Sequence, residues 1–288
     1  MNAHQLGRFG TAHQTSWDWR AAINFICGGA GAALLAAAAL FGFPAPPALW
    51  IAIVACVLIG IGLLSVWHEI GRPQRALNVL FHPQTSWMTR EAFVAGALFL
   101  LVATALFVGS GLALQLAGLG GLLFLYCQSR ILRAARGVPA WREPAIVPLV
   151  IATGLLEGVG LLAVLSLFSG GPTPAMALAL TVLLLLRQIA WQYYLQRMRL
   201  GRMPASTAAI LDETHRQLLR IGTLPPMIAA VLALLIPSLA FVTLTIAAII
   251  AVASGAMLKF VLITRTAQVQ GYALGNKLRR GHPLAGAR

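Results

Sequence analysis

The sequence predicts an all-α fold: a polytopic membrane helix bundle of eight transmembrane helices with both termini in the cytoplasm. Hydrophobic residues make up 59% of the 288 residues and charged residues only 10%, which is too little polar surface for a soluble globule of this length. The apolar residues gather in eight stretches, and the basic residues alternate between successive connections. We therefore expect residues 1–288 to form a single integral membrane domain.

The eight apolar stretches are each near the ~20 residues that cross a bilayer as a helix. They lie at about residues 22–43, 47–67, 91–108, 112–129, 146–168, 174–196, 224–240 and 242–263. No small-residue cleavage site precedes the first span, so we expect no segment to be removed. That span contains Gly28, Gly29 and Gly31 followed by an alanine run, which suits close helix–helix approach in lipid. Tight turns follow the first, third and fifth spans, at residues 43–47, 109–111 and 169–172.

The basic residues predict the topology. Of the 21 Lys and Arg residues, 19 lie in the two tails and in the second, fourth and sixth connections, whereas the odd-numbered connections have none. Because short loops rich in Lys and Arg stay in the cytoplasm, both termini and all long loops should be cytoplasmic. The same bias, with attraction to anionic lipid headgroups, explains the formal charge of +14, so we expect no nucleic-acid partner.

Only two basic residues, Arg187 and Lys259, fall inside predicted helices. Glu157 lies near the middle of the fifth span and Arg187 near the middle of the sixth, at matching depth on either side of a tight turn. Since an isolated charge at that depth is costly, we predict an intramembrane ion pair of Glu157 and Arg187 that faces the bundle interior. Such a pair is either a proton relay or a buried contact that fixes helix packing.

The second connection is the densest polar segment of the chain. His68 ends the second span and Glu91 opens the third, so the connection brings both to the membrane surface. Glu69, Arg72, Arg75 and Arg90 lie between them. A carboxylate at a helix start also suits the helix dipole, and a histidine at a helix end is commonly a simple hydrogen-bonding residue.

Two strings in this connection resemble the signature of membrane anchor subunits of the dimethyl sulfoxide reductase family. The first string has His68, Gly71, Pro73, Arg75 and Ala76, and the second has Ser86, Trp87, Arg90 and Glu91. Glu69 stands where an apolar residue is usual, and Met88-Thr89 stands where Leu-Ser is common. The eight predicted helices agree with this family over nearly the whole chain.

The resemblance implies a subunit that anchors an iron–sulfur ferredoxin-like subunit and a molybdopterin catalytic subunit, and that exchanges electrons with ubiquinone or menaquinone. It associates His68 and Glu91 with the quinone pocket. Quinone reduction takes two electrons and two protons, and a histidine and a partly desolvated glutamate can supply such protons. Arg72, Arg75 and Arg90 would either stabilise a reduced quinone anion or bind lipid headgroups.

Other redox cofactors are not expected in this chain. The three cysteines lie singly in predicted helices and form no CxxC motif, so we expect neither an iron–sulfur cluster nor a metal site. Among the six histidines only His68 touches a predicted span, which argues against a haem with two histidine ligands. Electrons would then pass directly between the partner's cluster and quinone, so the pocket should lie close to the docking face.

Topology distinguishes branches of the family. A cytoplasmic motif loop places the partner subunits on the cytoplasmic side of a bacterial inner membrane. This favours quinone reduction in complexes that resemble sulfite-oxidising enzymes or phenylacetyl-CoA:acceptor oxidoreductases. The alternatives are quinol oxidation for a terminal reductase such as dimethyl sulfoxide reductase, a small-molecule transporter that uses Glu157 and Arg187, and a purely structural anchor.

The predicted topology can be tested with a reporter fused after residue 288. We expect the reporter to be cytoplasmic, because the C-terminal tail is rich in Lys and Arg. A reporter that is active only on the opposite side of the membrane would reverse the assignment of the docking face.

Overall fold

The computed structural model describes residues 9–14, 16–41, 47–68, 73–201 and 203–272. Within them, eight helices are long and apolar enough to cross a membrane, which confirms the predicted all-α membrane bundle. The spans are α2 (Trp19–Ile23), η1 (Asn24–Gly28) and α3 (Gly29–Phe41) together; α4 (Pro47–Trp67); α5 (Trp87–Val108); α6 (Gly111–Ala134); α8 (Ile146–Leu165) with η3 (Ser166–Phe168); α9 (Pro174–Leu200); α10 (Ala205–Gln217), η4 (Leu218–Thr223) and α11 (Leu224–Leu235) together; and η5 (Pro237–Leu239) with α12 (Ala240–Thr264).

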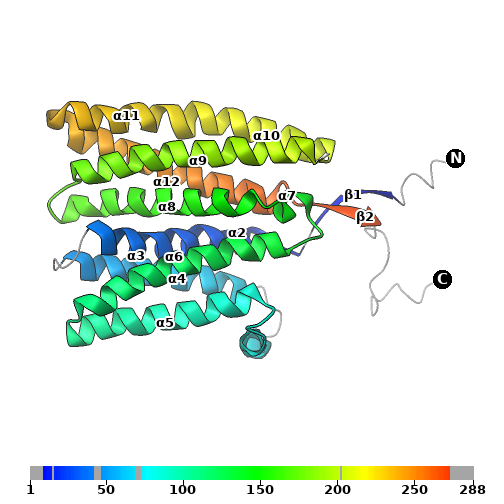
Figure 1. The fold of residues 1–288 in the computed structure, drawn as a ribbon, viewed down its shortest axis with the longest axis horizontal. Helices are drawn as coiled ribbons and strands as arrows, with labels where there is room; N and C mark the ends of the chain where they lie inside the picture. Colours follow the sequence, from blue (N-terminus) through cyan, green and yellow to red (C-terminus); the bar gives the residue numbers. More distant parts are fainter. Residues whose placement is uncertain (1–8, 15, 42–46, 69–72, 202, 273–288) are drawn as a thin grey trace.

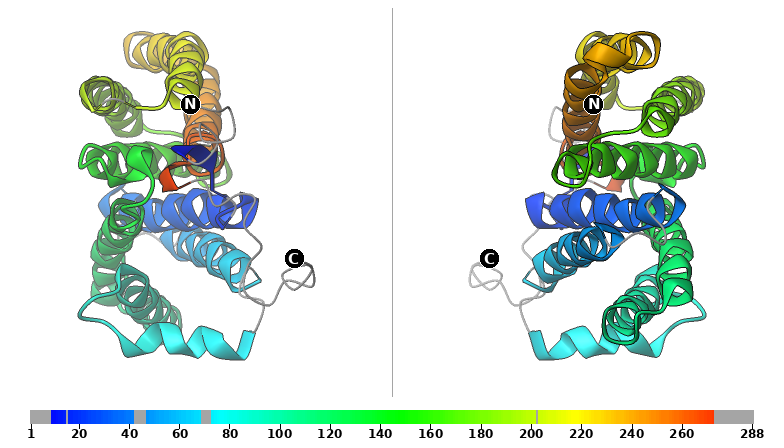
Figure 2. Two further views of the ribbon diagram at one scale, coloured as in Figure 1. Left: turned by 90° about the vertical axis from the view of Figure 1, so that its right-hand side faces the viewer. Right: turned by 90° about the vertical axis from the view of Figure 1, so that its left-hand side faces the viewer.

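The helices run along one common direction, and the first of them lies at the centre (Figures 1 and 2). Helix α3 packs against α4, α6 and α8, while α8 in turn packs against α9 and α12. Small residues permit this close packing, as expected: a Cβ at Gly31 would lie 2.6 Å from the carbonyl oxygen of Ala55 on α4. Helix α5 lies at one edge, where it packs mainly on α6.

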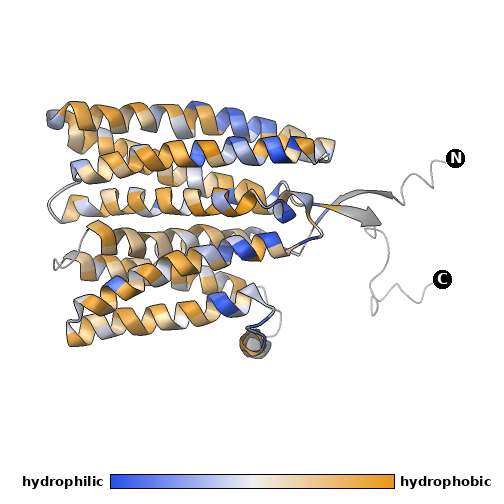
Figure 3. Cartoon of the chain, in the orientation of Figure 1, coloured by the Kyte–Doolittle hydropathy of each residue, from blue (hydrophilic) through white to orange (hydrophobic). Residues whose placement is uncertain are grey.

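Polar residues gather at one end of the bundle (Figure 3). We call it the arginine-rich end, and it carries His68, Trp87, Arg133, Arg142 and Arg199. Two short helices lie there: η2 (Pro73–Phe81), a 3-10 helix before α5, and α7 (Pro139–Arg142) before α8. The alternation of basic connections is thus a real asymmetry of the fold, because every connection that contains arginine reaches this end (Figure 1).

The predicted seventh span, at 224–240, is wrong in both bounds. The helix begins at Ala205 and ends at Leu235, and the turn to the last span lies at 236–239. Its first half is amphipathic, with Leu211, Thr214 and Leu218 buried and polar residues on the exposed side. Hydropathy misses such a segment because its mean is low, although one face packs into the bundle.

A small antiparallel ribbon joins the beginning and the end of the described chain. Strand β1 (Phe9–His13) pairs with β2 (Gln268–Tyr272), with Phe9 opposite Tyr272 and His13 opposite Gln268. The ribbon extends from the arginine-rich end (Figure 1). Hydropathy and motifs predict no strand, because a pairing of two five-residue segments so far apart in the chain has no local signal.

Glu157 makes an ion pair inside the bundle, but its partner is Lys259 and not Arg187. The Glu157 carboxylate on α8 contacts the Lys259 ammonium on α12, and both side chains are almost completely buried, 1% and 2% exposed. The predicted burial of Glu157 is confirmed and the predicted partner is wrong. Helix α8 turns the face that bears Glu157 toward α12, against which it packs closely.

Arg187 is also fully buried, but its hydrogen bonds go to α12 and to the π-helical turn η4. Its guanidinium donates to the Ser254 hydroxyl at 2.8 Å, to the Thr223 hydroxyl at 3.4 Å, and to the carbonyl oxygen of Gly222. The residue four positions after Gly222 is Pro226, which has no backbone N–H, so the Gly222 carbonyl has an acceptor to offer. Matching depth on neighbouring helices was therefore not enough to predict the pair.

Removal of Lys259 alone should strongly destabilise the bundle. In Lys259→Met the Glu157 carboxylate stays buried without its counter-charge, and breaking a buried pair in this way costs about 3–5 kcal/mol. We expect a clearly lower midpoint of thermal unfolding in detergent, and recovery of most of the loss in Glu157→Gln/Lys259→Met, in which no charge is stranded.

The matched control is Arg199→Gln, which breaks the exposed Arg199–Asp212 pair (N–O distance 3.0 Å). Exposed pairs contribute little, so its midpoint should stay at that of the parent protein. Equal midpoints for Lys259→Met and the control would show that the buried pair does not support the fold.

Candidate functional site

A cavity of about 340 Å³ opens at the arginine-rich end, between the first span, α4 and α5. Its volume is at the lower end of the roughly 300–1,000 Å³ typical of ligand pockets. Apart from Ser16, Asn24 and Glu91, the lining is apolar or aromatic. The lining residues are Ser16, Trp17, Ala21, Asn24, Phe25, Leu63, Val66, Trp67, Val79, Met88, Glu91, Ala92 and Ile131.

Glu91 is the single acidic residue of this lining. It is only 4% exposed, and its Oε1 atom has no hydrogen-bond partner among the described residues. The rest of the carboxyl group interacts with the side chains of Gln128 and Asn24. A buried polar atom without a partner is uncommon in a folded protein and calls for water or a ligand. The cavity therefore combines apolar walls with one acidic side chain, that of Glu91.

Local structure at the start of α5 places Glu91. The Ser86 hydroxyl caps the helix by accepting a hydrogen bond from the Thr89 amide at 3.3 Å. The Thr89 hydroxyl donates to the carbonyl oxygen of Val79, which ties η2 to the helix. These contacts fix the first turns of α5, and hence the direction in which Glu91 points.

Asn24 and Gln128 are members of the site that sequence reasoning missed. Gln128 on α6 is fully buried, and its Nε2 donates to the carbonyl oxygen of Asn24 at 2.9 Å. Asn24 begins the π-helical turn η1, which leaves that carbonyl available. A Cβ at Gly29 would lie 2.8 Å from both the Gln128 Oε1 and the Lys259 Nζ. The Gln128 amide and the ammonium group of the ion pair therefore both pack against α3 at Gly29. The available signal was an amide residue inside each of two apolar spans.

His68 does not line the cavity. It is exposed, and its backbone carbonyl accepts a hydrogen bond from the Arg20 guanidinium at 3.1 Å. Arg20 also pairs with Asp18, and this hydrogen bond lowers the pKa of Asp18 below its ordinary value. Trp67, the residue before His68, does line the cavity. His68 thus lies on the outside of the wall that Trp67 forms.

Arg90 has a positioning role in the loop. Its Nε donates to the carbonyl oxygen of Pro83 and its Nη2 to that of Gln84, both at 2.8 Å. Its guanidinium also lies over the Trp87 ring, 4.2 Å from the centroid. Arg90 therefore holds the loop before α5 and does not line the cavity. Glu69 and Arg72 lie outside the described residues, as does the side chain of Arg75, so Glu91 is the one described side chain of the predicted set that faces the cavity.

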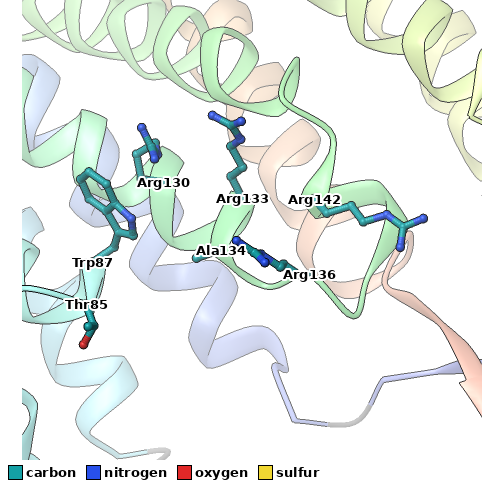
Figure 4. Close-up of a pocket in the computed structure, with 7 residues that line it drawn as sticks. All are labelled: Thr85, Trp87, Arg130, Arg133, Ala134, Arg136 and Arg142. Atoms are coloured by element: carbon teal, nitrogen blue, oxygen red, sulfur yellow. The ribbon is translucent and has the colours of Figure 1, made fainter.

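A second, basic cavity of about 670 Å³ lies beside the first, and we call it the arginine pocket (Figure 4). Four guanidinium groups surround it, and no Asp or Glu contributes to its lining. The Arg130 guanidinium packs over the Trp87 ring, 4.4 Å from the centroid, and donates to the Tyr126 hydroxyl at 2.6 Å. The lining residues are Thr85, Trp87, Arg130, Arg133, Ala134, Arg136 and Arg142.

The first cavity fits a flat, mostly apolar ligand with polar oxygens at its edge. Indole and phenyl rings from Trp17, Phe25 and Trp67 offer stacking surfaces. The Glu91 carboxyl group accepts a hydrogen bond when ionised and donates one when protonated, so it can serve either redox state of a carbonyl/hydroxyl pair. A quinone ring meets this description.

Comparison with known proteins shows a partial similarity to a dehydrogenase subunit. The chain is 30% identical over 139 residues to a subunit of the sulfite dehydrogenase of Allochromatium vinosum, a match that covers 42% of this chain and 43% of that protein. No protein-family model matches the chain. The matched protein is, by its name, a subunit of a dehydrogenase. The chain is therefore an eight-helix membrane protein with partial similarity to a subunit of a redox enzyme.

Proposed function

We propose that this chain is the membrane subunit of a multisubunit oxidoreductase and exchanges electrons with membrane quinone in the cavity that Glu91 lines. The observation that carries the proposal is the position of Glu91, a buried carboxyl group in the lining of an apolar cavity, at the end of the bundle where the polar connections meet. One of its oxygens has no hydrogen-bond partner among the described residues. The partial similarity to a dehydrogenase subunit supports it.

The residues of the cavity have distinct tasks in this proposal. Trp17, Phe25 and Trp67 bind the ring and exclude water. Glu91 binds an oxygen of the ring and transfers a proton at that atom, while Asn24 and Gln128 orient the carboxyl group. When bound, ubiquinone or menaquinone supplies the two-electron, two-proton couple.

The arginine-rich end is the docking face in this proposal. An iron–sulfur ferredoxin-like subunit would bind there and carry a molybdopterin catalytic subunit, on the cytoplasmic side of a bacterial inner membrane. Because the cavity opens at this end, an electron would travel only a short way between the partner and the quinone. Quinone reduction is the lead direction, with sulfite or phenylacetyl-CoA as the oxidised substrate class; quinol oxidation uses the same residues in reverse.

Glu91→Gln in the assembled complex should abolish most quinone-coupled turnover. Glutamine keeps the shape and the hydrogen bonding but cannot transfer a proton, and loss of a general acid–base group costs about 10²–10⁴-fold in rate. Turnover with a soluble dye acceptor, which bypasses the membrane, should be unchanged. The control Asp212→Asn removes an exposed carboxylate on α10 and should leave both activities intact. If Glu91→Gln retains full quinone turnover, the proton-transfer role is wrong.

Filling the cavity tests binding separately from proton transfer. Ala92 lines the cavity beside Glu91, so Ala92→Phe should raise the KM for quinone by roughly tenfold or more through loss of ring contacts, with dye-coupled turnover preserved. Gly96→Ala is the control on the same helix, because its added Cβ meets open space. An unchanged KM in Ala92→Phe would exclude this cavity as the quinone site.

A further inference from the structure

The arginine pocket has no counterpart in the quinone chemistry proposed above. Arg130 and Arg133 project from the last turns of α6, and Arg136 and Arg142 come from the connection that follows (Figure 4). Arg133 and Arg136 are exposed, and within the described part of the chain neither forms an ion pair. Four arginine residues in one cavity lining without a carboxylate are matched by an anion with several acceptor oxygens, such as a phosphate group.

The outer face of α6 leads directly to this pocket. Leu112, Leu116, Leu119 and Leu123 follow one another at steps of four and three residues, and their side chains are 66%, 44%, 63% and 51% exposed. The same steps continue to Tyr126, Arg130 and Arg133, so all seven side chains share one stripe of the helix. The stripe is apolar from Leu112 to Leu123, about 17 Å along the helix, then aromatic, then cationic.

We propose that the arginine pocket and the leucine stripe of α6 bind an anionic diacyl phospholipid. The headgroup phosphate lies among the guanidinium groups, which bind phosphate with paired N–H donors, and the acyl chains lie along the leucines. Trp87 and Tyr126 pack edge to face, 5.6 Å between centroids, at the level where aromatic side chains meet lipid headgroups. This inference does not depend on quinone binding.

The stripe favours a lipid over an acidic segment of a soluble partner. A soluble partner docked on the arginine-rich end would neutralise the guanidinium groups, but it would not contact the leucines on the membrane side of Trp87 and Tyr126, whereas a phospholipid contacts both. An anionic phospholipid matches all three zones in their order along α6. Its negative charge also distinguishes it from a zwitterionic phospholipid, whose ammonium group would meet four guanidinium groups.

The test measures retained lipid in the purified full chain. We would load it in detergent with phosphatidylglycerol or with phosphatidylethanolamine of the same chain length, and count bound lipid by native mass spectrometry. The variant Arg133→Gln/Arg136→Gln should bind phosphatidylglycerol about 10- to 30-fold more weakly, given the contribution of each basic side chain near an anionic headgroup. The control Arg199→Gln/Arg216→Gln removes the same charge at the same end, from α9 and α10, and should bind it as the parent does.

A second variant tests the chains. Leu116→Ala/Leu123→Ala should weaken retention of long-chain phosphatidylglycerol several-fold, with little effect on glycerol phosphate or inorganic phosphate, because those anions lack chains. An unchanged unfolding midpoint verifies that each variant is folded.

Three outcomes would overturn the proposal. If the two double-arginine variants lose the same amount of bound phosphatidylglycerol, the lipid is held by general charge attraction. If inorganic phosphate displaces phosphatidylglycerol completely, the pocket is a site for free anions. If Arg133→Gln/Arg136→Gln keeps its lipid but no longer retains the soluble subunits in the complex, the pocket is a protein docking site instead.

Discussion

The membrane interior offers no water to a buried charge, and this constraint organises the bundle around the ion pair of Glu157 and Lys259. Each charge alone would be costly at that depth, so α8 and α12 must stay in the register that joins them. Arg187 obeys the same rule with neutral acceptors, Ser254 and the carbonyl of Gly222. The result is that four of the eight spans are tied together by polar contacts that lipid cannot replace.

Two widened helical turns provide the acceptors that this arrangement needs. The turn η1 exposes the carbonyl of Asn24 to Gln128, and the turn η4 exposes that of Gly222 to Arg187. In a regular α-helix the carbonyl of Asn24 would be paired with the amide of Gly28, whereas that of Gly222 would meet Pro226, which has no N–H. Buried polar atoms without a hydrogen-bond partner occur at both places, among them the Arg187 Nε and the Glu91 Oε1. Glu91 differs in that it lines the apolar cavity.

Hydropathy and charge alternation predict the positions of the membrane spans, because these depend on single residues and their neighbours in the sequence. Those signals located all eight spans, most of them to within a few residues. They did not identify the partner of Glu157, because helix neighbours depend on which face each helix turns inward, and they missed α10, whose burial is amphipathic. The site shows the same division. Glu91 was predictable as a carboxylate at a helix start, but Asn24 and Gln128 joined it only through contacts between distant spans.

The residues of the second string, Ser86 to Glu91, form the start of α5, and the helical geometry there decides what each of them contacts. Trp87 and Arg90 are three residues apart, so they share the face that borders the arginine pocket, where Arg90 lies over the Trp87 ring. Met88 and Glu91 have the same spacing on the next face, and both line the apolar cavity. Thr89 lies between them and holds η2. A helix advances about 100° per residue, so one and a half turns of α5 are enough to build walls for two cavities of opposite character. Residues 87 to 91 thus contribute to both cavities and to the packing of η2.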